Sequence, residues 1–200
     1  MTQRYTDVQL DALRELSNIA SGTAAGALSQ MLGREVDINV PEALSLPLAD
    51  AVEACGDPEE EVSGIVIPVV GDMEALVLLL VPYEHGATLC RLLGVEPGSE
   101  VGDSALREIG NILGTSYLTV LAQMTGLALE PCPPHLNTDM LAAIVASLLA
   151  ETAGSGDTAL VLDSELDVAD EACSLSFLLI PTSGDASDLL APLGLADQAS

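Results

Sequence analysis

The chain has 200 residues, and 49% of them are hydrophobic, which is enough for a substantial core. Three Tyr, one Phe and no Trp are present, so that core must consist mainly of aliphatic side chains. Asp and Glu number 31 against five Arg and no Lys, and the formal net charge is −26. A surface this anionic repels phosphate backbones and anionic lipids, so we expect neither nucleic acid nor a membrane as a partner.

Two explanations of the charge remain open. An acidic surface can keep a protein hydrated in a high-salt cytosol, where screening removes much of its self-repulsion. The same charge could instead steer the protein toward a basic partner. We favour the first explanation, because the acids are spread along the whole chain and Lys is absent.

The cysteines and the apolar segments indicate a cytoplasmic protein. The first six residues carry no apolar signal core, and the apolar stretches 75–82 and 141–150 are well short of the ~18 residues that span a bilayer. The cysteines form no CxxC pair, so we expect free thiols, no metal site and no intrinsic cofactor. They are Cys55, Cys90, Cys132 and Cys173.

The first half of the chain predicts a long helix, three strands and a short helix. An apolar stripe of helical period runs through about Thr6–Leu32, from a Thr6–Gln9 capping box to Gly33. A short strand is expected at Glu35–Val40; Pro41 ends it, and a loop follows. Two buried strands then form a hairpin around the Gly71-Asp72 turn, ahead of the short helix. These three elements are Val62–Val70, Glu74–Val81 and Tyr83–Leu93.

The second half repeats this order, with one inserted apolar helix. Leu78–Pro82 is echoed by Phe177–Pro181, which supports a duplication. The predicted elements are a long helix at about Glu100–Met124, a strand at Leu127–Glu130, the inserted helix at Thr138–Glu151, strands at Asp157–Leu166 and Ala172–Ile180, and a short helix at Asp185–Leu193.

The predicted fold is α+β, with a pseudo-twofold duplicated α-β-β-β-α unit. We expect one domain over 1–200, made of repeat 1 (about 6–94) and repeat 2 (about 100–194). Three strands cannot easily be covered within one repeat, so the halves should join edge to edge in one six-stranded, mainly antiparallel sheet packed on the long helices. The first long helix should approach a neighbouring helix closely, because it contains Ser21, Gly22, Ala24, Ala25 and Gly26.

One polar pattern occurs twice, in the two long helices. Asn18 precedes Pro41 by 23 positions, Asn111 precedes Pro134 by the same number, and the two copies are 93 positions apart. The copies read Asp11-x3-Glu15-x2-Asn18 and Ser104-x3-Glu108-x2-Asn111.

Glu and Asn three positions apart lie on one helix face, and both pairs stand apart from the apolar stripe of their helix. Asn both donates and accepts hydrogen bonds, which suits it to hold a water in line with a phosphorus atom, while Glu could pair with a Lys on a partner. Such a pair is no self-sufficient active site, so the electrophile and any Mg²⁺ would come from the partner. A single Glu-x2-Asn on an exposed helix carries little weight, and the duplication could be inherited without activity.

The duplicated pattern resembles that of the CheC branch of the CheC/CheX/FliY phosphatases of prokaryotic chemotaxis. The resemblance covers essentially the whole chain in length, repeat order and both motifs. It implies hydrolysis of the aspartyl phosphate on the response regulator CheY, with Asn18 and Asn111 orienting water and Glu15 and Glu108 contacting a Lys of the regulator. Mg²⁺ would be held by the regulator, and the receptor deamidase CheD is an expected second partner.

Two alternatives belong to other functional classes. Middle domains of the flagellar switch, as in FliM, are related in fold but act as interaction surfaces and lack the Glu–Asn pairs. The protein could also act mainly as a regulator of CheD, with weak phosphatase activity. The intact pairs at Glu15–Asn18 and Glu108–Asn111 favour the phosphatase.

Overall fold

The computed structural model describes residues 7–151, 158–168 and 171–182. Thr6 and the predicted helix Asp185–Leu193 lie outside these residues. The helices are α1 (Asp7–Leu32), α2 (Leu48–Cys55), α3 (Tyr83–Leu92), α4 (Glu100–Thr125) and α5 (Leu141–Glu151). The strands are β1 (Val36–Pro47), β2 (Glu61–Gly71), β3 (Ala75–Pro82), β4 (Leu129–Pro131), β5 (His135–Met140), β6 (Thr158–Val168) and β7 (Glu171–Pro181).

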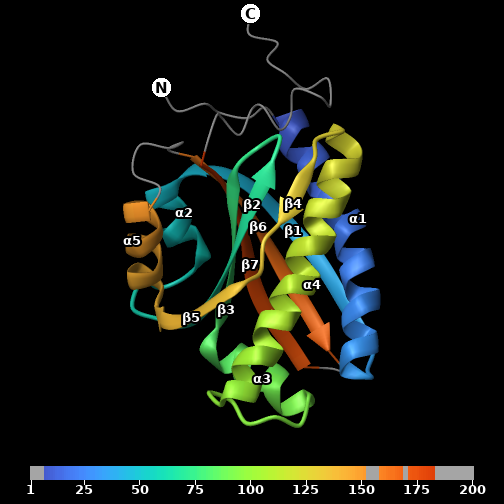
Figure 1. The fold of residues 1–200 in the computed structure, drawn as a ribbon, viewed down its shortest axis with the longest axis vertical. Coiled ribbons are helices and arrows are strands. Elements are labelled where there is room, and N and C mark those ends of the chain that lie inside the picture. The colour runs from blue at the N-terminus through green and yellow to red at the C-terminus, as the bar shows by residue number, and fades with distance from the viewer. Residues whose placement is uncertain (1–6, 152–157, 169–170, 183–200) are drawn as a thin grey trace, which may run out of the picture.

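The molecule has three layers. A central antiparallel sheet carries α1 and α4 on one face and α2 and α5 on the other (Figure 1). The larger core lies between the sheet and the two long helices, and includes Leu16, Leu28, Ile109 and Leu113. A smaller core lies on the opposite face, where α5 packs on β2, and α2 on β1 and β6. The predicted α+β class, with long helices on an antiparallel sheet, is confirmed.

The strands of the two sequence repeats interleave. The order is β1-β6-β7-β3-β2-β4, and β5 also pairs with β2. In the two repeats, β1 corresponds to β4, β2 to β6 and β3 to β7, and the second half of the strand order therefore mirrors the first. A pseudo-twofold axis thus passes between β3 and β7, where Leu78 pairs with Leu178. The expectation that complete halves join edge to edge is therefore wrong, because β1 pairs with β6 of the other half and β4 and β5 pair with β2.

Three local predictions need correction. The sheet has seven described strands where six were expected, because the segment around Pro133 and Pro134 separates β4 from β5. Pro41 does not end β1; the strand continues to Pro47, and its register shifts between Asn39 and Glu42. A proline lacks the N–H that a regular ladder needs, and an irregularity in an edge strand tolerates this loss. The loop predicted after Pro41 contains the rest of β1 and then α2.

α4 approaches the sheet most closely at two glycines. A Cβ built on Gly110 would lie 2.7 Å from Cγ2 of Ile65 and 2.8 Å from its Cδ1, and a Cβ on Gly114 would meet Ile67. Both isoleucines belong to β2 and are fully buried. The absence of two side chains on α4 therefore fixes how deeply the helix sits on the sheet.

Replacing Gly110 tests this close approach. We expect Gly110→Ala to destabilise the protein by about 1–3 kcal/mol, because the added methyl overpacks against Ile65. Gly22→Ala on α1 is the matched control, since a Cβ there meets nothing within 4 Å and Ala should stabilise the helix by about 1 kcal/mol. Urea titrations of both variants measure the change, and equal stability of the two variants would contradict the packing argument.

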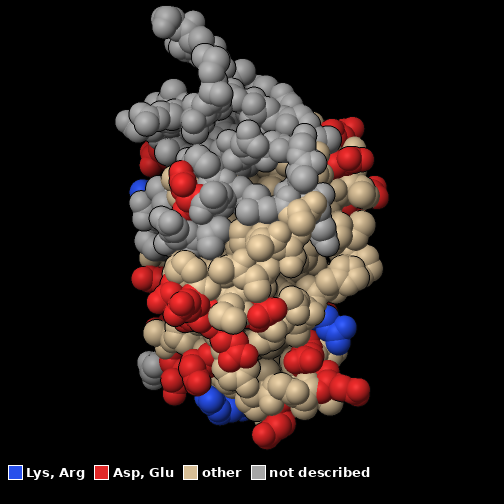
Figure 2. All heavy atoms as spheres, turned by 90° about the vertical axis from the view of Figure 1, so that its left-hand side faces the viewer, with Lys and Arg blue, Asp and Glu red and all other residues tan. Residues whose placement is uncertain are grey.

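The acidic surface leaves many carboxylates close to one another. Figure 2 shows the side that carries α2 and α5, where acidic side chains are spread and basic ones are few. On the sheet, Asp37 of β1 pairs directly with Asp167 of β6, and these two acids and Glu165 line a hollow of about 570 Å³. Like charges directly opposite in a sheet repel each other. The ion pairs among the described residues, Arg14–Asp11 at 3.8 Å and Arg91–Glu84 at 3.9 Å, are exposed and contribute little.

Salt should therefore stabilise the folded chain. We expect the melting temperature to rise steadily between about 0.1 M and about 2 M KCl, because screening shortens the range of the repulsion. Asp167→Asn should melt higher than the parent at the low-salt end and gain less from added salt, since one of the facing carboxylates is gone. Maximal stability in dilute buffer would contradict the high-salt interpretation of the composition.

Candidate functional site

The candidate site lies on the outer surface of the two long helices. α1 and α4 lie side by side over the sheet and run in opposite directions (Figure 1). Each helix turns a mainly aliphatic stripe inward: Leu13, Leu16, Ala20, Ala24 and Leu28 on α1, and Leu106, Ile109, Leu113, Tyr117 and Val120 on α4. The remaining faces are left for polar residues and solvent.

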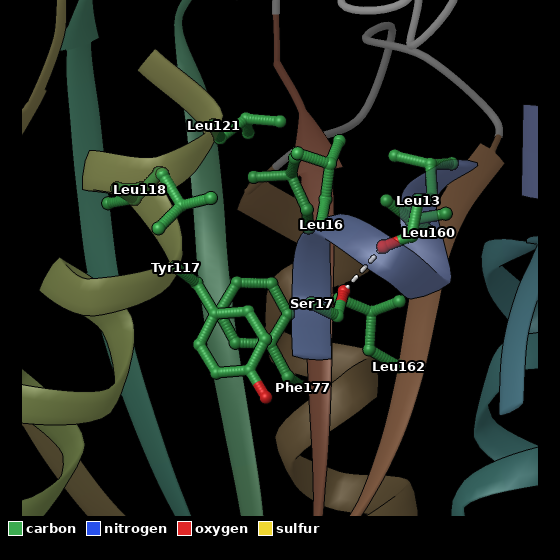
Figure 3. Close-up of a pocket in the computed structure, with 11 residues that line it drawn as sticks. Leu13, Leu16, Ser17, Tyr117, Leu118, Leu121, Leu160, Leu162 and Phe177 are labelled. Atoms are coloured by element: carbon green, nitrogen blue, oxygen red, sulfur yellow. Dashed lines mark hydrogen bonds between the residues drawn. The ribbon is translucent and has the colours of Figure 1, made fainter. Parts of the chain in front are cut away.

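Tyr117 joins the two helices to each other and to the sheet. Its hydroxyl shares a hydrogen bond of 2.8 Å with the Ser21 hydroxyl on α1 and one of 3.3 Å with Ser164 on β6. Its ring stacks on Phe177 of β7, with centroids 4.6 Å apart (Figure 3). Burial raises the pKa of Tyr117, while the bonds to Ser164 and Ser21 act in the opposite direction. The phenol is therefore a neutral structural group that fixes α1 relative to α4.

The apolar seam around Tyr117 contains a small cavity of about 30 Å³. Leucines of α1, α4 and β6 surround it, and the Ser17 hydroxyl donates to the Leu13 carbonyl at 2.8 Å instead of pointing into open space (Figure 3). Its lining is almost entirely apolar, so it offers no polar partner for a ligand and belongs to the core.

The first polar pair lies on the exposed side of α1. Glu15 and Asn18 are exposed, as is Asp11 one turn earlier, whose carboxylate forms the 3.8 Å ion pair with Arg14. Ser21 and Ala24 are buried against the rest of the molecule, as expected for a close helix contact. Gly22 and Gly26 are exposed instead, and a Cβ on either would meet nothing within 4 Å. The prediction that these two glycines face a neighbouring helix is therefore wrong, and they leave a bare stretch of helix beyond Asn18.

The second polar pair occupies the equivalent turn of α4. Glu108 and Ser104 are exposed and Asn111 is half-buried. The helix is well anchored at its ends, because the Ser99 hydroxyl accepts from the Gly102 amide at 3.1 Å and Gly126 closes the helix with φ of 74°. The pair is thus held on a defined helix rather than on a loop.

The two Glu–Asn pairs lie on neighbouring helices of the same layer, but they are separated along the helix axes. Ser21 and Tyr117 lie at about the same level of the two helices, because their hydroxyls share a hydrogen bond. Asn18 lies three residues before Ser21 and Asn111 six residues before Tyr117, so in antiparallel helices the two Asn are on opposite sides of that level. At 1.5 Å rise per residue, the two Asn are about 14 Å apart along the helix axes. The structure therefore presents two separate Glu–Asn pairs and does not combine them into one four-residue centre.

The two motif prolines lie away from the helix faces. Pro41 is in β1 at the register shift, and Pro134 is half-buried in the segment between β4 and β5. The two prolines follow their helices at corresponding places in the two repeats, in or just before a strand that pairs with the other repeat. Each proline is 23 residues after the Asn of its motif because the chain takes the same route from helix to strand in both repeats.

Sequence reasoning overlooked one pair of residues beside the motifs. Arg14 precedes Glu15 and Arg107 precedes Glu108, again with an offset of 93 positions, and both side chains are exposed. Each Arg lies one turn before the Asn of its own motif, at i and i+4, so the two share a helix face. A residue-by-residue alignment of the two long helices would have found them.

The thiols and other potential ligands lie outside these pairs. Cys90 and Cys173 are buried, and burial raises the pKa of both thiols. Within the described residues, no group of three or more His, Cys, Asp or Glu side chains is arranged to hold a metal ion. No helix in the described ranges is both long and apolar enough to cross a membrane.

Comparison with known proteins connects this geometry to a family. The model of the CheC-like family matches residues 8–45 and 101–137, the two segments that contain the motifs. The CheY-P phosphatase CheC of Bacillus subtilis (strain 168) is 34% identical over 166 residues, which are 79% of each chain. The flagellar motor switch phosphatase FliY of the same organism is 25% identical over 139 residues, 66% of this chain but 36% of that protein.

A solved structure supports the same assignment at the level of the fold. Thermotoga maritima FliY superposes with a TM-score of 0.77 at 20% identity, over 96% of this chain and 98% of that one. The long match to Bacillus subtilis CheC, together with the family model over both motif segments, identifies the family. The chain belongs to the CheC-like family.

Proposed function

We propose that this protein is a phosphatase of phosphorylated CheY, acting in the cytoplasm through two Glu–Asn sites. The observation that carries the proposal is the pair of Glu–Asn motifs at matching places on the outer surfaces of α1 and α4. Membership of the CheC-like family and the similarity to a CheY-P phosphatase support it.

The proposed chemistry requires little from this chain beyond positioning. The amide of Asn18 or Asn111 enters the regulator's pocket, where its oxygen accepts a hydrogen bond from the attacking water. The water oxygen bonds to phosphorus while the bond from phosphorus to the aspartyl oxygen breaks. The aspartate leaves as a carboxylate, and the inorganic phosphate retains the proton released by the water. Holding the water in line supplies the rate enhancement.

The carboxylates serve docking in this proposal. Glu15 and Glu108 are exposed, so each can form a charge-assisted bond with a Lys of the regulator and set the register of the Asn beside it. Mg²⁺ is assigned to the regulator, as the family resemblance implies. Because Glu and Asn are one helical turn apart on a rigid scaffold, a single docking geometry places both side chains.

Other roles compete with this proposal. A purely structural module of the flagellar switch would not need Asn18 and Asn111, which form the chemical part of the motif. CheD is retained as a proposed second partner on the strength of the family alone. Separate pull-downs against CheY and CheD would distinguish a phosphatase from a protein that acts mainly on CheD.

The two Asn can be tested together. We expect the double variant Asn18→Ala, Asn111→Ala to lose at least about 100-fold in the rate of phosphate release from phosphorylated CheY, because no amide then orients the water. Its melting curve should match the parent's, since Asn18 is exposed and Asn111 half-buried. Each single variant should keep the activity of its intact site. A double variant with the parental rate would refute the mechanism.

The bare helix surface at Gly22 gives a second test. Gly22→Gln places a long side chain one turn beyond Asn18, where it should keep the regulator from approaching. In a protein that also carries Asn111→Ala, we expect kcat/KM to fall by roughly tenfold to a hundredfold with no loss of stability. Ala146→Gln, at an exposed position of α5 on the opposite face of the sheet, is the matched control. Equal kcat/KM for the two variants would mean that the regulator does not dock over Gly22.

A further inference from the structure

The two arginines beside the motifs stand out against the composition of the chain. The protein has five Arg and 31 acids, yet two of the five occupy matching positions on the exposed faces of α1 and α4. Arg14 lies one turn before Asn18, and Arg107 lies one turn before Asn111. Side chains at i and i+4 are neighbours on a helix, so each amide has a guanidinium beside it.

The negative charge of the proposed substrate can explain why an arginine lies beside each Asn. An aspartyl phosphate is anionic, and a protein with net charge −26 repels it before contact. A cation next to each amide offsets that repulsion where the two proteins meet. Arg suits the task, because its planar guanidinium stays charged and can donate two parallel hydrogen bonds to phosphate or carboxylate oxygens.

We propose that Arg14 and Arg107 are docking residues that contact the anionic rim of the phosphorylated pocket at their respective sites. This inference rests on the proposed function and adds a recognition element to each site: the unit that binds the regulator is Arg-Glu-x2-Asn. The Arg determines affinity and the Asn determines the chemical step, so the two residues should affect different kinetic constants.

The two arginines are not equally available. The Arg14 guanidinium lies 3.8 Å from the Asp11 carboxylate, which neutralises part of its charge. The position equivalent to Asp11 on α4 is Ser104, and no carboxylate of the described residues lies within 4 Å of the Arg107 guanidinium. Arg107 instead donates through Nε to the Asp103 carbonyl at 3.3 Å, which leaves its terminal nitrogens for a partner. The loss of Arg107 should therefore weaken docking more than the loss of Arg14.

Binding measurements separate this role from catalysis. The probe is CheY carrying beryllofluoride and Mg²⁺ as a stable stand-in for the phosphorylated state, and the readout is Kd at several salt concentrations. We expect Arg107→Gln to weaken binding about tenfold at low salt and by less at high salt, because screening weakens the contact between the guanidinium and the anionic partner. The effect of Arg14→Gln should be smaller. Arg107→Lys should recover only part of the affinity, because it restores the charge without the planar guanidinium. Arg91→Gln on α3 is the control, because it removes the same charge from another exposed arginine.

Every outcome decides the question. A Kd for Arg107→Gln equal to that of Arg91→Gln overturns the inference, as does a fall in kcat for phosphorylated CheY with an unchanged Kd. Absence of binding by the parent protein removes both this inference and the proposed function. If the parent binds but does not release phosphate, the phosphatase proposal fails, while the Kd comparison still tests the arginines.

Discussion

The contact between α1 and α4 determines what the outer surface can do. Ser21 and Ala24 allow α1 to approach its neighbour, and the buried Tyr117 hydroxyl ties α1, α4 and β6 together. On the other side of α4, the bare backbone at Gly110 and Gly114 lets the helix rest on Ile65 and Ile67. Two polar motifs on separate helices thus acquire fixed positions, although no hydrogen bond or ion pair among the described residues joins one motif to the other.

Charge and packing make opposite demands on this chain. The two cores are mainly aliphatic, whereas the surface carries a large excess of acid with few ion pairs among the described residues. The cores therefore stabilise the folded state, and repulsion between surface acids destabilises it. Salt should reduce this destabilisation, because it screens the acids. The same excess of negative charge opposes binding of an anionic partner. In the proposal above, individual arginines at the contact offset this repulsion locally.

Local patterns in the sequence predicted the elements well, and contacts between distant segments explain the rest. The helical stripe and Gly126 predicted α4 to within one residue, and the Gly71-Asp72 turn predicted the hairpin of β2 and β3. Pro41 misled because a missing N–H ends a regular strand, whereas an edge strand can shift its register and continue. α2 was missed because it is only eight residues long. Its burial of Ala51 in the second core depends on distant segments and leaves no local pattern in the sequence.

For the candidate site, the sequence predicted the pairs but not their surroundings. The spacing of Glu15 and Asn18 requires a shared helix face, and the structure places both on the exposed side. That Gly22 faces open space while Ser21 is buried depends on how α1 is rotated against α4, and this rotation follows from the whole interface. Arg14 and Arg107 were overlooked because adjacent charges of opposite sign look like ordinary helix surface until the two repeats are compared.

The exchange of strands between the repeats has an evolutionary consequence. A gene coding for one repeat would produce a chain whose first strand has no neighbour of its own, because β1 finds its partner in β6 and β4 and β5 find theirs in β2. Two such chains would have to wrap around each other to complete the sheet. Fusing them would place both repeats in one chain and would free the two motif-bearing helices to diverge from each other, as the positions of Asp11 and Ser104 already have.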